Sequence, residues 1–297
     1  SFTQPLMYKV IAAHPQVWFQ NRLSADTVDG MFGWYWRYLR RTARRFDSVI
    51  VGSHWFGERI RRHGGIESSL VPLGVDKRLF HPRRREPELR RKLLAGFGLP
   101  PSARLLVGVG RHHPEKQWPV VFRGVGALRD ESVAMVQIGN GFDHAAVQRA
   151  AAQAGNVALL GHIADRELLA GIMASADALV HGSRAETFGL VASEGLACGT
   201  PLVLPSEGGC TDAADPAWAE LYPAGDAMAA RDAVHRLLHR NAEELRVAAI
   251  TARRTHISTP EQHFERLFSL YANRTPLVMT PDPLPAGFAG DAGLAAA

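Results

Sequence analysis

The sequence predicts an α/β protein with parallel, doubly wound sheets. Short apolar runs alternate with longer amphipathic segments along most of the 297 residues, and strands that alternate with helices pair in parallel. The 46% hydrophobic content is enough to bury the cores of two domains. Pro, Gly and Ala dominate from Thr275 onward, so we expect a disordered tail over residues 275–297.

The first 100 residues contain few predicted elements. Residues 36–46 predict an arginine-rich helix, residues 48–52 a strand, and residues 55–63 the helix that follows it. The apolar run 70–75 then leads into a basic segment over 81–92. We expect this basic segment to be the linker between two domains.

The second unit shows a regular alternation of elements. We expect its strands near residues 105–109, 133–138, 157–160, 178–181 and 201–205. We expect its helices near residues 116–129, 143–154, 165–175, 187–198, 226–239 and 260–272. Ligands of such sheets bind beyond the carboxyl ends of the strands. Arg111, Gly139 and Glu186 would lie at that edge.

Two glutamates, Glu186 and Glu194, stand eight residues apart around the start of the expected helix 187–198. Eight helical residues rise about 12 Å and place the two positions about 80° apart. Carboxylates so placed could bind hydroxyl groups at both ends of an elongated ligand, with an anion at the helix N–H groups between them. The same spacing also occurs by chance in many helices. The apolar neighbours of Glu194 predict partial burial, so its carboxylate needs a partner.

The segment resembles the E-x7-E signature of family 4 retaining glycosyltransferases. Further stretches similar to that family follow in order over residues 107–111, 114–116, 136–141, 156–162, 176–178 and 206–209, so the resemblance covers residues 47–272. It implies the GT-B architecture, in which two Rossmann-like domains face each other. Residues 1–85 would be the N-terminal acceptor-side domain, 86–258 the nucleotide-sugar-binding domain, and 259–274 a closing helix that crosses back.

The resemblance also implies roles for individual residues. Arg111 and Lys116 would bind the donor diphosphate, Glu186 the sugar hydroxyls, and Glu194 the ribose hydroxyls. The other positions that would line the donor site are Gly110, Gly139, Asn140, Gly141, Thr187, Phe188, Gly189 and Leu190.

His14 has two interpretations. It follows a strand-like run, roughly where the family places a histidine that faces the donor sugar, or it is a strand-end histidine without a role. Catalysis by His112 or His113 is not expected.

The implied reaction is retaining, metal-independent transfer of a hexose from a nucleotide-diphosphate sugar to a glycan or lipid-linked acceptor. We expect neither a metal nor a cofactor, since no Asp-x-Asp motif is present. The alternative is a nucleotide-sugar-binding module without transfer activity. About 85 residues precede the basic segment and the chain starts without Met, so we expect the first part of the N-terminal domain to be missing. A dehydrogenase is discounted because the Gly-x-Gly-x-x-Gly turn is absent.

The charge is uneven along the chain. Residues 1–100 carry 18 Lys and Arg against 8 Asp and Glu, a net +10, whereas the remainder carries 16 against 21, a net −5. Arginines of segment 36–46, with Met31, Phe32, Trp34, Tyr35 and Trp36, favour contact with anionic lipid headgroups. The alternative is a solvated helix face. Nucleic acid is not expected as a partner, because no recognised motif accompanies the charge.

The sequence also predicts where the protein works. No apolar run reaches the length of a spanning helix, and no signal peptide is recognised. Cys198 and Cys210 form neither a disulfide framework nor a metal-ligand cluster. We therefore expect a cytoplasmic protein with peripheral contact at the inner face of the cell membrane.

Overall fold

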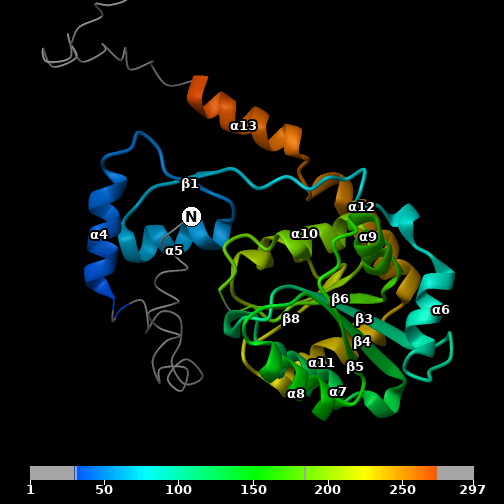
Figure 1. The fold of residues 1–297 in the computed structure, drawn as a ribbon. Helices are drawn as coiled ribbons and strands as arrows, with labels where there is room; N and C mark the ends of the chain where they lie inside the picture. Colours follow the sequence, from blue (N-terminus) through cyan, green and yellow to red (C-terminus); the bar gives the residue numbers. More distant parts are fainter. Residues whose placement is uncertain (1–29, 31, 184, 273–297) are drawn as a thin grey trace, which may run out of the picture.

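The computed structural model describes residue 30 and residues 32–183 and 185–272. The predictions for His14 and for the tail 275–297 lie outside the described residues. The chain folds into a small N-terminal unit and a larger C-terminal unit, with a helix that crosses from the second toward the first (Figure 1).

The C-terminal unit is built on a six-stranded parallel sheet in the order β5-β4-β3-β6-β7-β8. Its strands are β3 (Arg104–Val109), β4 (Val133–Ile138), β5 (Val157–Gly161), β6 (Ala178–Val180), β7 (Leu202–Pro205) and β8 (Ala219–Tyr222). The central strands β4, β6 and β7 are buried along their whole length, as the apolar runs of the sequence predict. The expected α/β class with a parallel sheet is confirmed.

Helices cover both faces of this sheet, as Figure 1 shows. One core contains Leu105, Val107 and Leu196 and lies under α6 (Pro87–Ala95), α9 (Arg166–Ser175), α10 (Leu190–Ala197) and α12 (Ala242–Thr255). The other contains Trp118 and Phe122 and lies under α7 (Trp118–Gly126), α8 (His144–Ala154) and α11 (Ala227–Leu238). The 3-10 turns η2 (Pro114–Lys116), η3 (Arg129–Glu131) and η4 (Gly209–Ala213) complete the unit.

The N-terminal unit contains α4 (Gly33–Ala43), β1 (Ile50–Val51), α5 (His54–Gly64) and β2 (Ser69–Leu70). The two strands pair in parallel. A small separate core, formed by Trp36, Val51, Ile60 and Ile66, joins the helices to the strands. Trp36 is 5% exposed and its ring stacks on that of His63, so the expectation that Trp36 contacts lipid is wrong.

The basic segment 81–92 is not an extended linker. It forms the 3-10 turn η1 (Pro82–Arg84) and then most of α6. Arg90 Nη2 on α6 lies 2.8 Å from Asp177 Oδ2, and both side chains are mostly buried. Local helix propensity and this ion pair therefore attach the segment to the C-terminal unit. Val75 and Phe80, which precede the segment, belong to the same core of the C-terminal unit as Leu105.

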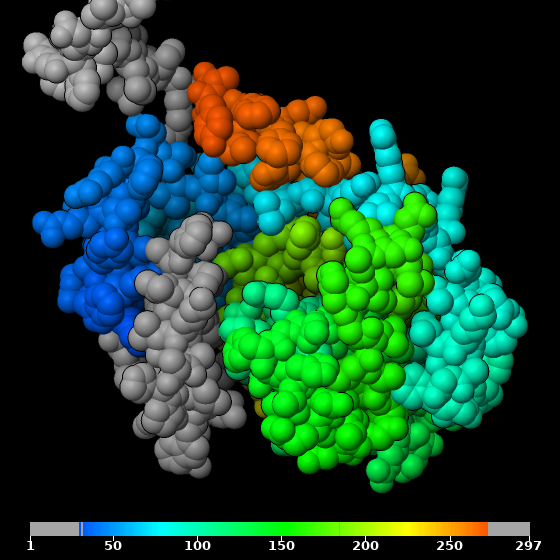
Figure 2. All heavy atoms as spheres, viewed as in Figure 1, coloured from blue at the N-terminus to red at the C-terminus, as the bar shows by residue number. Residues whose placement is uncertain are grey.

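The last described helix, α13 (Pro260–Ala272), crosses toward the N-terminal unit (Figures 1 and 2). Two hydrogen bonds connect α13, and Ser258 just before it, to the segment before η1. Val75 N–H donates to Ser258 O at 2.9 Å, and His263 Nδ1 lies 2.8 Å from Pro72 O. The expected final helix over 260–272 is confirmed.

Besides α6, one strand and one helix of the C-terminal unit were not expected from the sequence. The edge strand β8 has only four residues and includes the charged Glu220, so it lacks an apolar run. Helix α12 buries Leu245, Ala249 and Ala252, and alanine gives only a weak amphipathic signal. No helix within the described ranges is long and apolar enough to cross a bilayer.

Candidate active site

The order of the strands determines where a ligand can bind. The chain runs outward from β3 to β4 and β5, and then returns to the other side of β3 with β6, β7 and β8. The sheet therefore has a topological switch point between β3 and β6, where open α/β sheets bind ligands beyond the strand ends. The segments that follow these two strands begin with Gly110 and His181. They carry Arg111, Lys116 and Glu186.

The loop after β3 carries two cationic side chains, one mostly buried and one exposed. The Lys116 side chain is 15% exposed, and its Nζ lies 2.6 Å from Glu186 Oε2. The Arg111 side chain is 75% exposed and has one long contact, 3.5 Å from Nη2 to Glu115 Oε1. The buried indole of Trp118 donates to the Arg111 carbonyl at 3.0 Å. The backbone of Arg111 is thus fixed while its guanidinium can reach a ligand.

A buried hydrogen-bond network connects this loop to the one after β4. His112 is fully buried, with Nε2 at 2.7 Å from Gln137 Oε1 and Nδ1 at 3.0 Å from His144 Nδ1. The His112 N–H also donates to Asn140 O at 3.0 Å. These partners give His112 a structural role.

Gly139 is required at this junction for steric reasons. A Cβ atom there would lie 2.0 Å from the Gly110 carbonyl oxygen, and one at Gly141 would lie 2.4 Å from that of His112. The two loops consequently contact each other through their backbones. Asn140 is exposed beside them, and its Oδ1 accepts from the Gly141 N–H at 2.8 Å.

The helix after β6 begins later than the sequence indicated. Gly189 has a φ of 86° and is the N-cap of α10, which starts at Leu190. A left-handed residue interrupts a right-handed helix, so Glu186 lies on the preceding turn and Glu194 lies inside the helix. The expectation that the helix starts at Thr187 is therefore wrong, and the helix starts three residues later.

Glu186 has the most strongly stabilised negative charge at the site. Its side chain is 19% exposed, and His181 Nε2 lies 3.4 Å from the same Oε2 that contacts Lys116. Burial alone would raise the pKa of this carboxyl group. The neighbouring His181 imidazole and the Lys116 ammonium outweigh burial and lower the pKa to about 2. Glu186 is ionised throughout the neutral range.

The pKa of Glu194 is shifted in the opposite direction from that of Glu186. Burial raises its pKa to about 7, although the positive charge of Arg166 opposes this rise. None of the described residues forms a hydrogen bond or ion pair with its carboxylate. A partly buried carboxyl group without a partner is costly, and a ligand with hydroxyl groups could supply one.

The N-terminal unit contacts the turn that carries Glu186. Ser53 caps α5, and its hydroxyl donates to the Thr187 carbonyl at 2.6 Å. The first N–H of α5, that of His54, donates to Asp212 Oδ2 at 2.6 Å. The Phe188 ring lies against Gly52. Phe188 is therefore involved in packing between the two units, which the sequence did not predict.

The structure thus brings Lys116 and Glu186 into contact and places Arg111 and Asn140 on the adjoining loops. Glu194 and Leu190 lie on α10, and Gly110, Gly139, Gly141, Thr187, Phe188 and Gly189 form the turns between these groups. Sequence reasoning missed His181, Ser53 and Asp212. The only signal for His181 was its position at the end of an apolar run.

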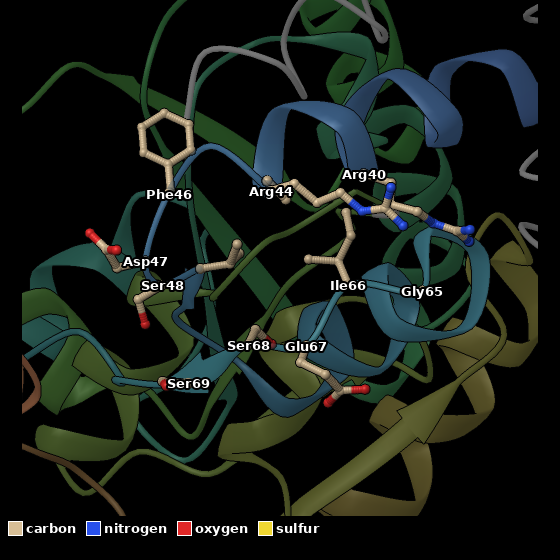
Figure 3. Close-up of a pocket in the computed structure, with 12 residues that line it drawn as sticks. Arg40, Arg44, Phe46, Asp47, Ser48, Gly65, Ile66, Glu67, Ser68 and Ser69 are labelled. Atoms are coloured by element: carbon tan, nitrogen blue, oxygen red, sulfur yellow. The ribbon is translucent and has the colours of Figure 1, made fainter. Parts of the chain in front are cut away.

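A cavity of about 340 Å³ lies in the N-terminal unit, between the end of α4 and the strands β1 and β2. Figure 3 shows its mixed lining, which includes Arg40, Phe46 and Glu67. None of its lining residues belongs to the loops after β3, β4 or β6. We place the candidate active site at those loops because the interacting charged groups gather there.

Comparison with known proteins gives a match over the part of the chain that carries these loops. Residues 103–240 match the family model described as "Glycosyl transferases group 1". This part of the chain is similar to the group 1 glycosyl transferases. The matched range contains the three loops and both glutamates.

Curated relatives extend the similarity beyond that range. The chain is 36% identical over 228 residues to a GDP-mannose-dependent alpha-(1-6)-phosphatidylinositol dimannoside mannosyltransferase of Mycobacterium tuberculosis, covering 76% of this chain and 53% of that protein. It is 33% identical over 187 residues to a D-inositol 3-phosphate glycosyltransferase of Nocardiopsis dassonvillei, covering 57% and 42%. The chain spans about half the length of the curated relatives it matches.

Solved structures support the fold of this chain. A sucrose-phosphate synthase from Thermosynechococcus elongatus has a TM-score of 0.68 at 24% identity, covering 80% of this chain and 60% of that one. HepE from Anabaena, in complex with UDP and glucose, has a TM-score of 0.67 at 19% identity, covering 81% and 67%. The expected GT-B fold is confirmed.

Proposed function

We propose that this chain is a retaining, metal-independent glycosyltransferase that moves a hexose from a nucleotide-diphosphate sugar to a glycan or lipid-linked acceptor. The observation that carries the proposal is the Lys116–Glu186 pair at the switch point of the sheet, with the exposed Arg111 guanidinium on the same loop as Lys116. An anion and two cations there suit a ligand that combines sugar hydroxyls with a diphosphate.

Each charged group has a defined task in this proposal. Arg111 and Lys116 bind the diphosphate and stabilise the negative charge that grows on it as the glycosidic bond breaks. These two cations take the part that a divalent metal plays in other transferases. Glu186 accepts hydrogen bonds from sugar hydroxyls, and Glu194 accepts them from the ribose. For retention, the acceptor attacks from the face that the diphosphate leaves, and the departing phosphate takes its proton.

GDP-mannose is the first donor to test, because the relative from Mycobacterium tuberculosis is named for it. The same name describes a phosphoinositide acceptor, which agrees with an acceptor carried by a lipid. We propose by this analogy that the acceptor here is lipid-linked. His14 is assigned no task, since it lies outside the described residues.

Peripheral contact with anionic membrane at the cytoplasmic face is part of the proposal. On α4, the side chains of Trp34 and Tyr38 are 62% and 58% exposed. The neighbouring Arg37 and Arg41 are exposed as well. Exposed aromatic rings beside arginines suit the boundary between headgroups and acyl chains. Vesicles rich in phosphatidylinositol should retain the protein at low salt and release it when Trp34 and Tyr38 are replaced by Ser.

The alternative is a module that binds nucleotide sugars without transferring them. The chain spans about half the length of the curated relatives it matches, so transfer activity needs a test of its own. Nothing in the donor site distinguishes the two functions, because both need Lys116 and Glu186.

The deciding experiment measures binding and turnover on the same sample. GDP, UDP, ADP and their hexose derivatives are first screened by thermal shift with EDTA present. A ligand at about 100 times its Kd should add about 2.7 kcal/mol to the free energy of unfolding. Release of nucleoside diphosphate with a phosphoinositide acceptor then supports transfer. Binding without release supports the module, and binding only after metal is added contradicts metal independence.

A further inference from the structure

His181 is an unusual residue of the donor site. It follows directly after β6, and its side chain is 2% exposed. Neither ring nitrogen forms a hydrogen bond with a described residue. Buried polar atoms in folded proteins nearly always have partners, so an exception needs an explanation. The contact of Nε2 with Glu186 Oε2 is 3.4 Å long and is not aligned as a hydrogen bond.

The backbone of His181 is firmly held, so its position is not accidental. Its N–H donates to Val203 O on β7 at 2.9 Å. Its carbonyl accepts from the hydroxyl of Tyr222, on β8, at 2.7 Å. The ring is thereby fixed beside Glu186, while the stronger partner of that carboxylate is Lys116, at 2.6 Å.

We propose that His181 is a positioning residue that donates a hydrogen bond to Glu186 when Lys116 turns to a donor diphosphate. This inference rests on the proposed function, in which Lys116 binds the diphosphate. Glu186 then loses its closest cation while it must still face the sugar. His181 is the buried donor already within 3.4 Å of it.

The neutral ring can donate from Nε2, and the exchange of partners also changes how strongly the ring binds a second proton. In the free site, burial lowers the pKa of His181, and the charge of Lys116 lowers it further, against the opposing effect of Glu186. His181 is consequently neutral at pH 7. When an anionic diphosphate offsets the Lys116 charge, one of the two effects that lower this pKa is removed while Glu186 remains. The pKa of His181 rises, and donor binding takes up a proton.

Other titratable groups near the ring do not supply this proton. Burial raises the pKa of Cys210 on η4 to about 12. The pKa of Tyr222 is also raised by burial. Both groups are neutral over the whole range of interest. Glu186 and Lys116 are the remaining charged partners of His181 among the described residues. Because binding takes up a proton, donor affinity should fall as the pH rises.

Two substitutions separate positioning from a general structural effect. His181→Gln keeps an N–H donor of similar reach but cannot titrate. His181→Leu keeps an apolar side chain of similar bulk and cannot donate. His239→Gln, at an exposed position that caps the end of α11, is the matched control.

Calorimetry with GDP-mannose measures both affinity and proton uptake. Titrations are made at pH 6.5 and 7.5 in phosphate-free buffers of different ionisation enthalpy. The diphosphate of GDP-mannose is a diester, so it has no group of its own that titrates in this range. GDP is the second probe for affinity, since it lacks the sugar that Glu186 contacts.

Wild type and His239→Gln should take up a fraction of a proton on binding GDP-mannose. His181→Gln should keep its affinity within about threefold and lose the uptake. His181→Leu should lose the uptake and bind GDP-mannose about 10- to 100-fold more weakly, the range expected for a hydrogen bond to a charged group. Its affinity for GDP should change far less.

The inference is overturned if both variants retain the proton uptake of wild type. It is also overturned if His181→Leu weakens GDP and GDP-mannose equally and His181→Gln restores neither. If wild type binds no nucleotide sugar of the screening panel, both the proposed function and this inference are refuted. If wild type binds GDP-mannose and both His181 variants bind it with the same affinity and proton uptake, only this inference is refuted and the proposed function stands.

Discussion

The clearest quantitative prediction concerns Glu194→Gln. Burial raises the pKa of Glu194 from its ordinary value of 4.5 to about 7. At about 1.36 kcal/mol for each pH unit, this difference corresponds to about 3 kcal/mol. Glutamine has the same shape and carries no charge, so the substitution removes the cost of ionising a buried carboxyl group.

The sign follows from proton binding. Between pH 4.5 and 7 the folded protein holds a proton on Glu194 that the unfolded chain has released, so the free energy of unfolding falls as the pH rises. Below pH 4.5 both states are protonated and the group has no effect. Glu194→Gln should therefore stabilise the protein by about 3 kcal/mol at pH 8 and by much less at pH 4.5.

Urea denaturation of wild type and variant at pH 4.5, 6 and 8 measures this difference directly. The exposed Glu265 on α13 provides the control variant Glu265→Gln, which should change stability equally at all three values. A Glu194→Gln variant that is equally stable or less stable than wild type at pH 8 would refute the reasoning. The same variant should bind nucleotides more weakly, since the ribose loses a charged acceptor.

Three further predictions concern the donor loops and the core. Arg111→Ala should weaken binding of a free nucleoside diphosphate. Glu186→Ala should mainly weaken the additional affinity that the sugar provides. Calorimetry with the nucleoside diphosphate and with its sugar derivative measures both changes in affinity. Gly189→Ala should lower the free energy of unfolding by more than about 2 kcal/mol, since a left-handed backbone costs about 1–2 kcal/mol and the new Cβ lies 2.6 Å from Cys210. Asp177→Ala should cost about 3–5 kcal/mol, measured in urea, because it leaves the mostly buried charge of Arg90 without a carboxylate partner.

Matched controls test each explanation. Gly98 has a φ of 68° with open space around it, so Gly98→Ala should cost the backbone strain without the clash. The exposed pair of Arg91 and Glu88 makes Glu88→Ala the control for Asp177, with an expected cost of under about 1 kcal/mol. Unchanged diphosphate binding by Arg111→Ala would show that the diphosphate lies elsewhere.

The sequence was most informative where apolar runs are continuous. Residues 105–109 and 133–138 are buried strands in the structure, since such runs are the direct signature of parallel strands covered on both faces. The positions of Arg111 and Glu186 follow from the same pattern, because each comes after a strand end. Spacing alone therefore located the edge of the sheet at which these charges gather.

What the sequence could not indicate depends on contacts between distant positions. Lys116 and Glu186 are 70 residues apart and lie in contact. The histidine beside them, His181, has no sequence pattern of its own, since only the fold shows that its ring is buried without a partner. The helix start at Leu190 depends on the left-handed Gly189, and glycine tolerates both hands of the backbone.

The contacts of α5 suggest how the two units influence each other's chemistry. Ser53 accepts from Phe56 N–H within its own helix and donates to the Thr187 carbonyl, while the same helix end binds the Asp212 carboxylate. A helix N-terminus attracts negative charge, so Asp212 and the α5 backbone stabilise each other across the boundary. The turn from Glu186 to Gly189 lies directly behind these contacts, because Gly209 N–H, three residues before Asp212, donates to Glu186 O at 2.6 Å. These contacts connect the turn that holds Glu186 to the N-terminal unit, so the position of that carboxylate depends on the N-terminal unit as well as on the sheet that carries it.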